Sequence, residues 1–520
     1  MLVDHFLSRH GLRENPFEAE EARDDPVLER LLDSGSAHPD FAKILGRIDR
    51  PTTSVVFGEK GSGKTAIRLL VARRVAAHNR ENPARKTLLV AYDDLNPVID
   101  RITKPVDAEG RDSDGPRIDA LRLEDHQDAI LSLALTRLID LILARPDRGS
   151  SGPPSRDAAA TLLPRARKLP REARARLAVM AAIYDQGGGG PLRARWMQLR
   201  SGLRLRRTLS AGAVRHVATA FLVLGLVCLG AGRLAETMSS LLYLSGGMAV
   251  ALGMAIFTGW IWRHIAVWRI ARRVAQQARA TGRGASDLQW MLLRLKYSDL
   301  ADQAWPSGGP EGRTRRYQLT LQLLEILGML DFTGLMVLVD RVDEPTQVSG
   351  SDQNMRSLVW PMLDNKFLKQ EGVGIKLLLP IELRHHLLRE SPQFFQEARL
   401  DKQNLVDRLA WSGPTLYDLC SARLAACQRT SDSEEHATDK PGDLMALFGQ
   451  DVTRDMIVDA LDAMQQPRDA FKFLYGLIQE HCRVVPDDQP IARIPRLTVE
   501  AVRRNQAQRV SDFQRGLGPG

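Results

Sequence analysis

Cysteine is scarce in this 520-residue chain, which holds only four, at positions 228, 420, 427 and 482. No two of them form a Cys-x-x-Cys pair, so the sequence excludes a disulfide framework and a cysteine-based zinc site and fits a reducing compartment. Residues 1–13 lack an apolar core as long as a secretory signal peptide needs, so we expect no such signal. No Ser-His-Asp or paired-carboxylate constellation stands out, which disfavours a hydrolase built on those groups.

Acidic residues are absent from two arginine-rich segments, 193–215 and 263–283. Together these segments hold thirteen arginines, which exceeds the net charge of +9 of the whole chain. The remainder is therefore net acidic, and the excess of basic residues is local. Such a distribution disfavours a general nucleic-acid-binding surface and draws attention to what lies between the two segments.

Two uncharged runs lie between the arginine-rich segments, Val217–Gly232 with 16 residues and Met238–Trp262 with 25. A membrane-spanning helix needs about 20 apolar residues, so the second run suffices alone and the first suffices when extended back to about Ala211. We therefore expect a transmembrane hairpin at about 211–232 and 238–262. By the positive-inside rule both of its outer ends face the cytoplasm. A buried hairpin of a soluble protein is the alternative.

The two uncharged runs also contain small residues and tryptophans. Small residues such as Gly247 and Ala251 would let the two helices approach closely. Tryptophans stand where an interfacial aromatic belt is expected: Trp260, Trp262 and Trp268.

The pattern Gly58-x-x-x-x-Gly63-Lys64-Thr65 follows a β-branched apolar run and precedes a helical one. This is the P-loop pattern, in which glycines let backbone amides curl around phosphate oxygens at a helix N-terminus. We expect Lys64 to reach the β- and γ-phosphates from a solvated position and Thr65 to ligate Mg²⁺. No Asn-Lys-x-Asp phrase for guanine occurs, which favours ATP. The predicted phosphate-binding residues are Gly58, Glu59, Lys60, Gly61, Ser62, Gly63, Lys64 and Thr65.

A second strand end carries a carboxylate. Leu335–Val339 reads as a buried strand, and Asp340 follows it directly, which is the Walker B arrangement. We expect Asp340 to hold Mg²⁺ opposite the Thr65 hydroxyl. Because that role commits Asp340, a different residue must activate the attacking water.

The catalytic base is expected among the charged residues that directly follow Asp340. Arg341 cannot accept a proton at neutral pH, which leaves Asp343 and Glu344. Reach favours Glu344, because its side chain is longer and Pro345 holds the turn after it. Asp343 stays the alternative.

Further charged residues at strand ends are weaker candidates. Asp93 and Asp94 could approach Mg²⁺ or be simple loop acids. Glu382 and Arg384 lie where related ATPases place a residue that senses the γ-phosphate. Arg399 is a candidate arginine finger for a neighbouring subunit, and a surface ion pair is the alternative.

The periodicity of the whole chain predicts an α/β P-loop NTPase fold, with a three-layer parallel sheet, an inserted transmembrane helical hairpin and a C-terminal helical lid. Residues 146–190 look like linkers around a basic helix. The expected strands are 53–57, 87–92, 335–339, 375–379 and 404–409. The expected units are a helical lead-in at 1–50, the two halves of the NTPase domain at 51–150 and 301–410, the insertion at 151–300 and the lid at 411–520.

A P-loop and a Walker B strand separated by more than half of the chain, with an apolar hairpin between them, resemble the KAP family of P-loop ATPases. The phrase Gln466-Pro467-Arg468-Asp469 is similar to the start of the sensor-2 helix in an AAA+ lid, which implies that Arg468 contacts nucleotide. Gly11–Phe17 resembles the lead-in of some bacterial AAA+ ATPases, although a turn anchored by a phenylalanine fits equally. The sequence departs from the KAP pattern at Arg341, where a second acid is typical.

The resemblance implies a cytoplasmic-facing ATPase at the inner membrane that uses ATP and Mg²⁺ to drive a conformational or assembly switch, often in signalling or defence. Membrane lipid is the implied partner, and a homo-oligomer or another protein partner stays open. The alternative is a soluble AAA+ DNA-binding adaptor. We favour the membrane, because the arginines flank runs of lipid-spanning length rather than alternate with base-reading residues.

Overall fold

Five parallel β-strands form the centre of the computed structural model, in the order β2-β3-β4-β1-β5. They are β1 Ser54–Gly58, β2 Lys86–Tyr92, β3 Phe332–Val339, β4 Val373–Pro380 and β5 Asn404–Val406. All five expected strands are confirmed, although β5 ends three residues early. The structure describes the chain apart from residues 20, 35–37, 104–117, 119–120, 144–155, 188–190, 206–210, 235–238, 302, 349–350, 429–442, 487–492 and 515–520.

The sheet is covered on both faces, which is why its strands are continuous apolar runs. Successive residues of a strand point to opposite faces. Val56 of β1 therefore packs with α3 (Phe41–Leu45) and α4 (Lys64–Glu81). Val55 and Phe57 point to the other face and join a much larger core that includes α6 (Leu123–Ile142) and α14 (Gly312–Met329). The three expected layers of an α/β fold are present.

The crossovers that follow β3 and β4 complete the second face. After β3 come α15 (Asp352–Val359), η4 (Trp360–Met362) and α16 (Asn365–Leu368). After β4 come α17 (Ile381–Leu388), α18 (Pro392–Ala398) and η5 (Leu400–Lys402).

A long insertion between β2 and β3 carries helices that extend the sheet's core. Besides α6 and α14 they are α5 (Asn96–Thr103), α7 (Arg156–Lys168), α8 (Arg171–Tyr184), α9 (Leu192–Gly202), α10 (Ala211–Leu234), α11 (Ser239–Gln277), η2 (Arg279–Thr281), α12 (Ala285–Leu292), α13 (Ser298–Ala301) and η3 (Gly309–Glu311). The interpretation of 146–190 as linkers around a basic helix is wrong for α8. Its last turns are fully buried, because its alanines let it pack tightly against α6.

The polar side chains that are buried beside α8 form hydrogen bonds with one another. The Tyr184 hydroxyl donates to Asp128 at 2.9 Å, and Arg316 donates to the same carboxylate at 2.7 Å. Burial raises the pKa of Asp128 to about 6, against the opposing effect of Arg316. Arg316 also donates to the carbonyl of Gln277, the last residue of α11, at 2.8 Å. One arginine thus joins α6, α14 and α11.

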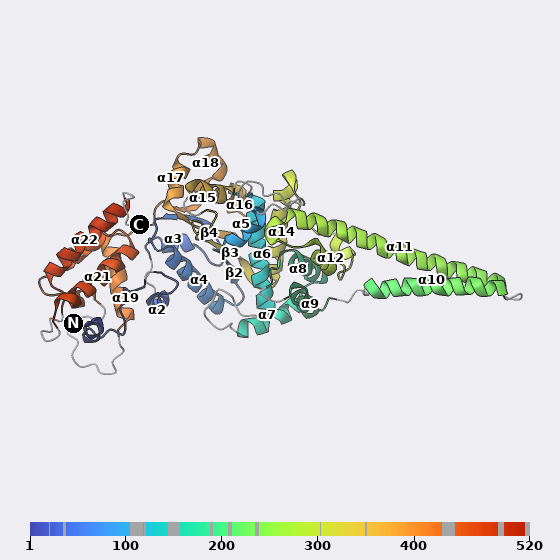
Figure 1. Cartoon of the computed structure of the whole chain (residues 1–520), viewed down its shortest axis with the longest axis horizontal. Coiled ribbons are helices and arrows are strands. Elements are labelled where there is room, and N and C mark those ends of the chain that lie inside the picture. The colour runs from blue at the N-terminus through green and yellow to red at the C-terminus, as the bar shows by residue number, and fades with distance from the viewer. Residues whose placement is uncertain are drawn as a thin grey trace.

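Helices α10 and α11 form an antiparallel hairpin that extends away from the rest of the molecule (Figure 1). Both are long and apolar enough to cross a membrane. The second helix continues to Gln277, well beyond the expected end at 262, and its last turns bury Val267, Ala271 and Val274 in the main core. The hairpin is therefore a rigid continuation of the core rather than a tethered anchor.

The two hairpin helices approach at glycines, but not at the expected one. A Cβ at Gly246 would lie 3.0 Å from the carbonyl oxygen of Gly225, whereas one at Gly247 would meet nothing within 4 Å. Neighbouring residues of a helix are about 100° apart around its axis, so Gly247 faces away from α10. Close packing is present, with Gly225, Gly246 and Gly253 at the contact.

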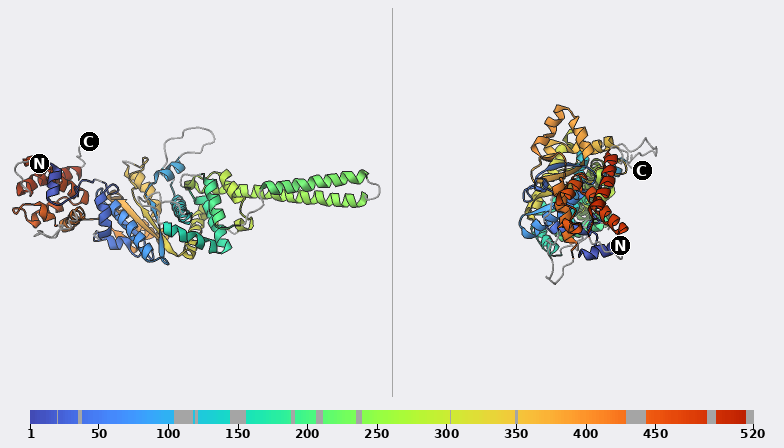
Figure 2. Two further views of the ribbon diagram at one scale, coloured as in Figure 1. Left: turned by 90° about the horizontal axis from the view of Figure 1, so that it is seen from below. Right: turned by 90° about the vertical axis from the view of Figure 1, so that its left-hand side faces the viewer.

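The C-terminal helices form a second core, and the N-terminus packs into it. These helices are α19 (Gly413–Ala426), η6 (Leu444–Leu447), α20 (Arg454–Asp462), α21 (Pro467–Val484) and α22 (Arg496–Gln514), joined by α1 (Val3–Arg9) and α2 (Pro26–Ser34). Phe17 of the lead-in is buried there, and the carbonyl beside it, of Pro16, accepts from Arg423 at 2.8 Å. This lid and the hairpin lie at opposite ends of an elongated molecule (Figure 2).

Candidate phosphate-binding site

The loop from Glu59 to Gly63 joins β1 to α4 at the carboxyl edge of the sheet. Gly61 and Gly63 have φ angles of +96° and +94°, a region that residues with a Cβ rarely adopt. A Cβ at Gly58 would lie 2.5 Å from the Ser62 hydroxyl oxygen, so this position also requires glycine. The loop curls tightly and ends at the N-terminus of an 18-residue helix, which is a favourable environment for an anion.

The ammonium group of Lys64 lies inside this curl. It donates to the carbonyl oxygens of Gly58 at 2.7 Å and Glu59 at 2.9 Å. Burial lowers the pKa of Lys64, and the charges of nearby carboxylates, that of Asp343 foremost, oppose this effect. The expectation of a solvated side chain is wrong, because the loop carbonyls replace water around the ammonium group.

Thr65 and Asp340 meet although they are far apart in sequence. The Thr65 hydroxyl lies 3.4 Å from a carboxylate oxygen of Asp340, at the end of β3. Burial raises the pKa of Asp340, and the charge of Arg68 opposes that rise. A hydroxyl and a carboxylate are the oxygen ligands that Mg²⁺ accepts together with phosphate oxygens and water. Within the described part of the chain no group of three or more His, Cys, Asp or Glu could hold a metal. The Thr65–Asp340 pair therefore fits Mg²⁺ only together with phosphate oxygens.

Arg68 is a functional-site residue that the sequence analysis missed. It is buried, its Nε lies 3.5 Å from Asp340, and it forms an ion pair with Asp93. Asp93 also pairs with Arg23 at 3.0 Å. Two arginines thus hold one oxygen of the Asp93 carboxylate. The spacing in the sequence could have indicated this role, since Arg68 follows Lys64 by one helical turn on the same face of α4.

The two candidate bases differ in their surroundings. Glu344 accepts from Arg341 at 2.9 Å, and its side chain is 53% exposed. Asp343 is exposed too, but among the carboxylates its charge acts most strongly on Lys64. Arg341 has a φ of +59°, so the chain turns sharply after β3. The charge of Asp343 acts on Lys64, whereas the Glu344 carboxylate is engaged by Arg341.

The lid reaches the loop through side chains of two segments. The indole of Trp411 donates to the carbonyl of Ser62 at 2.9 Å, and Gln466 donates to the Glu59 carboxylate. Arg408 pairs with the same carboxylate at 2.6 Å. The structure brings Arg468 to the loop as expected, since a Cβ at Gly61 would lie 3.0 Å from the Cβ of Arg468.

The remaining candidates lie outside this cluster or at its edge. Glu382 follows β4, and its charge acts on Lys64. Arg384 is 3.7 Å from Asp407 and Arg399 is 3.9 Å from Asp401, so both form ion pairs within the chain. Lys60 and Asp94 are exposed.

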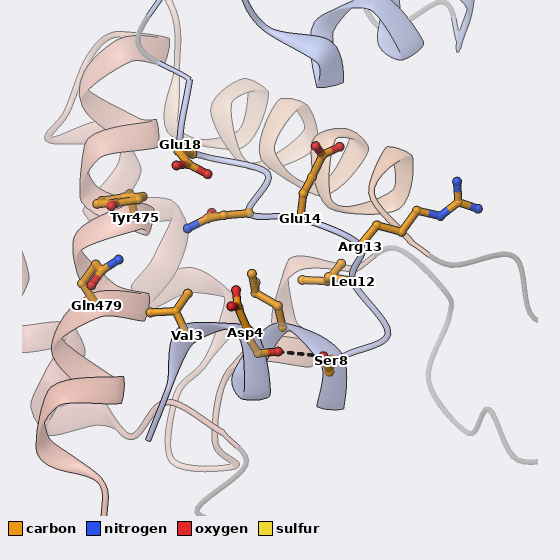
Figure 3. A pocket seen from close by; sticks show the side chains of 11 residues that line it. Val3, Asp4, Ser8, Leu12, Arg13, Glu14, Glu18, Tyr475 and Gln479 are labelled. Atoms are coloured by element: carbon orange, nitrogen blue, oxygen red, sulfur yellow. Dashed lines mark hydrogen bonds between the residues drawn. The ribbon is translucent and has the colours of Figure 1, made fainter.

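A cavity of about 410 Å³ lies apart from the loop, between α1, the lead-in and α21 (Figure 3). Tyr475 and Gln479 line it, two to three turns farther along α21 than Arg468. Its charged lining residues are three acids, Asp4, Glu14 and Glu18, and one base, Arg13. This net acidic lining disfavours phosphate.

Comparison with known proteins finds no match to this chain. The chain matches no family model, no curated protein and no solved structure. The fold is a mixed α/β architecture with an all-parallel sheet.

Replacing Arg68 with methionine tests its hold on Asp340. We expect Arg68→Met to cost about 3 kcal/mol at neutral pH, because a buried carboxylate loses its cation. The folded-state pKa of Asp340 rises further above the unfolded value of about 3.9. The folded state then binds more protons, so the free energy of unfolding should fall as pH rises through that window.

The matched control is the double variant Arg68→Met/Asp340→Asn, which carries no charge to bury. Chemical denaturation at several pH values should show that it loses this pH dependence and recovers part of the stability. Identical pH profiles for the single and double variants would show that Arg68 does not compensate Asp340.

Proposed function

We propose that the chain is a KAP-like P-loop ATPase, anchored in the inner membrane with its sheet and lid in the cytoplasm. One observation carries this proposal: the curled loop at 58–65 encloses Lys64 and places Thr65 beside Asp340. The strand order supports it. The connection from β1 leads toward β2, whereas that from β4 leads the other way to β5. Ligands of open parallel sheets bind outside the carboxyl ends of strands at such a switch point.

The residues divide the chemistry among them. The amides of the loop and the Lys64 ammonium would bind the β- and γ-phosphates, with Lys64 exchanging its two carbonyl partners for phosphate oxygens. Thr65 and Asp340 would hold Mg²⁺, which neutralises charge on the phosphates when bound. Arg68 contacts Asp340, and its charge favours the ionised form of that carboxylate. Asp343 is the proposed base that accepts a proton from the attacking water, in preference to Glu344.

Contacts between lid and loop support a role as a switch. Glu59 is held by Arg408 before the lid and by Gln466 within it. Lys64 donates to the backbone carbonyl of the same residue, so a triphosphate that draws Lys64 away acts directly beside this contact. Binding and hydrolysis would thereby alter how the lid docks. Signalling or defence, oligomeric state and partner proteins are implied by the resemblance alone.

Several arginines of the two arginine-rich segments are buried, which favours the membrane hairpin over the DNA-binding alternative. Arg195 is buried and pairs with Asp140 and Asp185 at 2.6 and 2.7 Å. Arg200 and Arg283 are buried as well. These side chains hold helices together and are not available to phosphates of DNA. The exposed side chains of the hairpin are instead large and apolar, among them Leu224, Leu244 and Met248.

Nucleotide binding is tested by Lys64→Met, which keeps the aliphatic part of the side chain. We expect affinity for Mg-ATP to fall about tenfold or more, since a charge-assisted hydrogen bond is worth about 1.5–3 kcal/mol. Equilibrium binding to the full chain in detergent is the measurement. Arg74→Met, which removes an exposed charge from the same helix, is the control and should bind normally. Unchanged affinity in Lys64→Met would refute the proposed phosphate site.

Hydrolysis rates decide between the two acids. We expect Asp343→Asn to bind ATP normally and to hydrolyse it at least about tenfold more slowly, a barrier change of roughly 1.4 kcal/mol. Glu344→Gln should stay within about twofold of the parental rate, because its carboxylate is engaged by Arg341 and exposed. The reverse ranking would restore Glu344 as the base. Parental rates in both variants would exclude both acids.

Topology is tested by cysteine labelling in a Cys228→Ala background, in which the three other cysteines are buried. A cysteine at Arg233, near the hairpin tip, should react with an impermeant thiol reagent added outside spheroplasts. One at Arg273, exposed beyond the apolar part of α11, should react only after lysis. Release of the chain by high salt or carbonate would contradict the spanning hairpin.

A further inference from the structure

A small pocket with a basic lining lies between α8, the segment that runs from Leu295 into α13, and the residues that follow α9. Its volume is about 130 Å³. Ligand pockets for larger organic molecules are about 300–1,000 Å³, so this pocket suits a compact group and not a nucleotide. Its charged lining residues are Arg171, Arg174, Arg204, Lys296 and Asp299.

The cations of this basic pocket are not balanced by acids. Asp299 is the single carboxylate in the lining, and it pairs with Arg171 at 2.7 Å. Arg174 donates to the carbonyl of Leu203 at 2.8 Å, and its Nε is buried with no hydrogen-bond partner among the described residues. Neither Arg204 nor Lys296 forms an ion pair with any described residue. Arg204 is exposed and Lys296 is half-buried, so an anion in the pocket would gain two cations that have no acidic partner among the described residues.

The backbone conformation of Arg204 also places it in the pocket. It adopts a φ of +51°, which is unfavourable for a residue with a Cβ. Leu203 is the C-cap of α9, and the turn at Arg204 places Arg204 in the pocket lining rather than on a further turn of the helix. Backbone bonds from Arg204 to Ser201 at 3.0 Å and from Leu205 to Arg200 at 3.3 Å hold that turn.

The pocket lies level with the end of the apolar stretch of the hairpin. Arg263 directly follows that stretch on α11, and it donates to the carbonyl of Leu295 in the pocket wall at 2.7 Å. Trp262 and Tyr297 have ring centroids 6.1 Å apart, and both are exposed. Leu205, on another wall, is the last described residue before α10 begins at Ala211. Figure 1 shows α8, α9 and α12 where the hairpin joins the body.

We propose that this basic pocket binds the phosphate of an anionic phospholipid headgroup in the cytoplasmic leaflet. The proposal rests on the spanning hairpin of the proposed function. Basic pockets at the cytoplasmic ends of membrane helices are suited to such headgroups, and aromatic side chains mark the same level of the bilayer. A free phosphate offers the same oxygens but has no reason to favour a site beside exposed Trp262. The lipid is therefore the source to which the geometry points.

The experiment measures phosphatidylglycerol retained by the full chain. Protein purified in a neutral detergent is mixed with phosphatidylglycerol or phosphatidylcholine at equal concentration, and bound lipid is counted by native mass spectrometry. We expect the parental chain to retain phosphatidylglycerol selectively. The variant Arg204→Gln/Lys296→Gln should bind it at least about tenfold more weakly, because it loses two cations that have no protein partner. These residues are exposed or half-buried, so a thermal melt should confirm that the variant stays folded.

The matched control is Arg269→Gln/Arg273→Gln, which removes the same charge from exposed positions near the same end of α11. It should keep parental binding. Equal losses in both variants would reduce the effect to general surface charge and overturn the proposal. So would equal retention of phosphatidylcholine, or full displacement by millimolar inorganic phosphate, which would define a free-anion site.

Carbonate extraction of membranes that contain the chain distinguishes a failure of the lipid pocket from a failure of the spanning hairpin. A parental chain that carbonate releases would refute the spanning hairpin and the lipid site together. A chain that resists carbonate but shows no preference for phosphatidylglycerol would refute the pocket alone.

Discussion

The parallel register of β1, β4 and β3 is the constraint on which the site depends. Gly58 pairs with Pro380, and Val339 pairs with Leu377 on the other side of β4. Because all three strands run the same way, their carboxyl ends meet at one edge of the sheet. That edge holds the loop that encloses Lys64, and it is where Asp340 follows β3. A slip of one residue would turn Asp340 to the other face and away from Thr65.

Buried ion pairs transmit this arrangement to the rest of the molecule. Arg68 joins α4 to the ends of β2 and β3 through Asp93 and Asp340. Arg316 joins α14, which leads directly into β3, to α6 and to the end of α11. Losing one member of such a pair leaves a buried charge, so these contacts resist sliding. Arg316 thus links the end of α11 to the helix that precedes β3.

The lid contacts the loop from a core of its own. Its core is separate from that of the sheet and contains the N-terminal lead-in instead. Its contacts with the loop include a few hydrogen bonds, from Trp411, Gln466 and Arg468. Contacts of this kind are exchanged at small cost in water.

The sequence alone determined the features that depend on neighbours in the chain. The five strands, the glycine pattern of the loop and the two long apolar helices follow from local composition and period. The tertiary structure decided every feature that depends on which face of an element meets another. It buried α8, which proline and arginine content had suggested was peripheral, and it placed Gly246 rather than Gly247 against α10. It also put Arg68 beside Asp340. These outcomes rest on helix rotation and strand register, which local sequence leaves open because they are set by packing between distant segments.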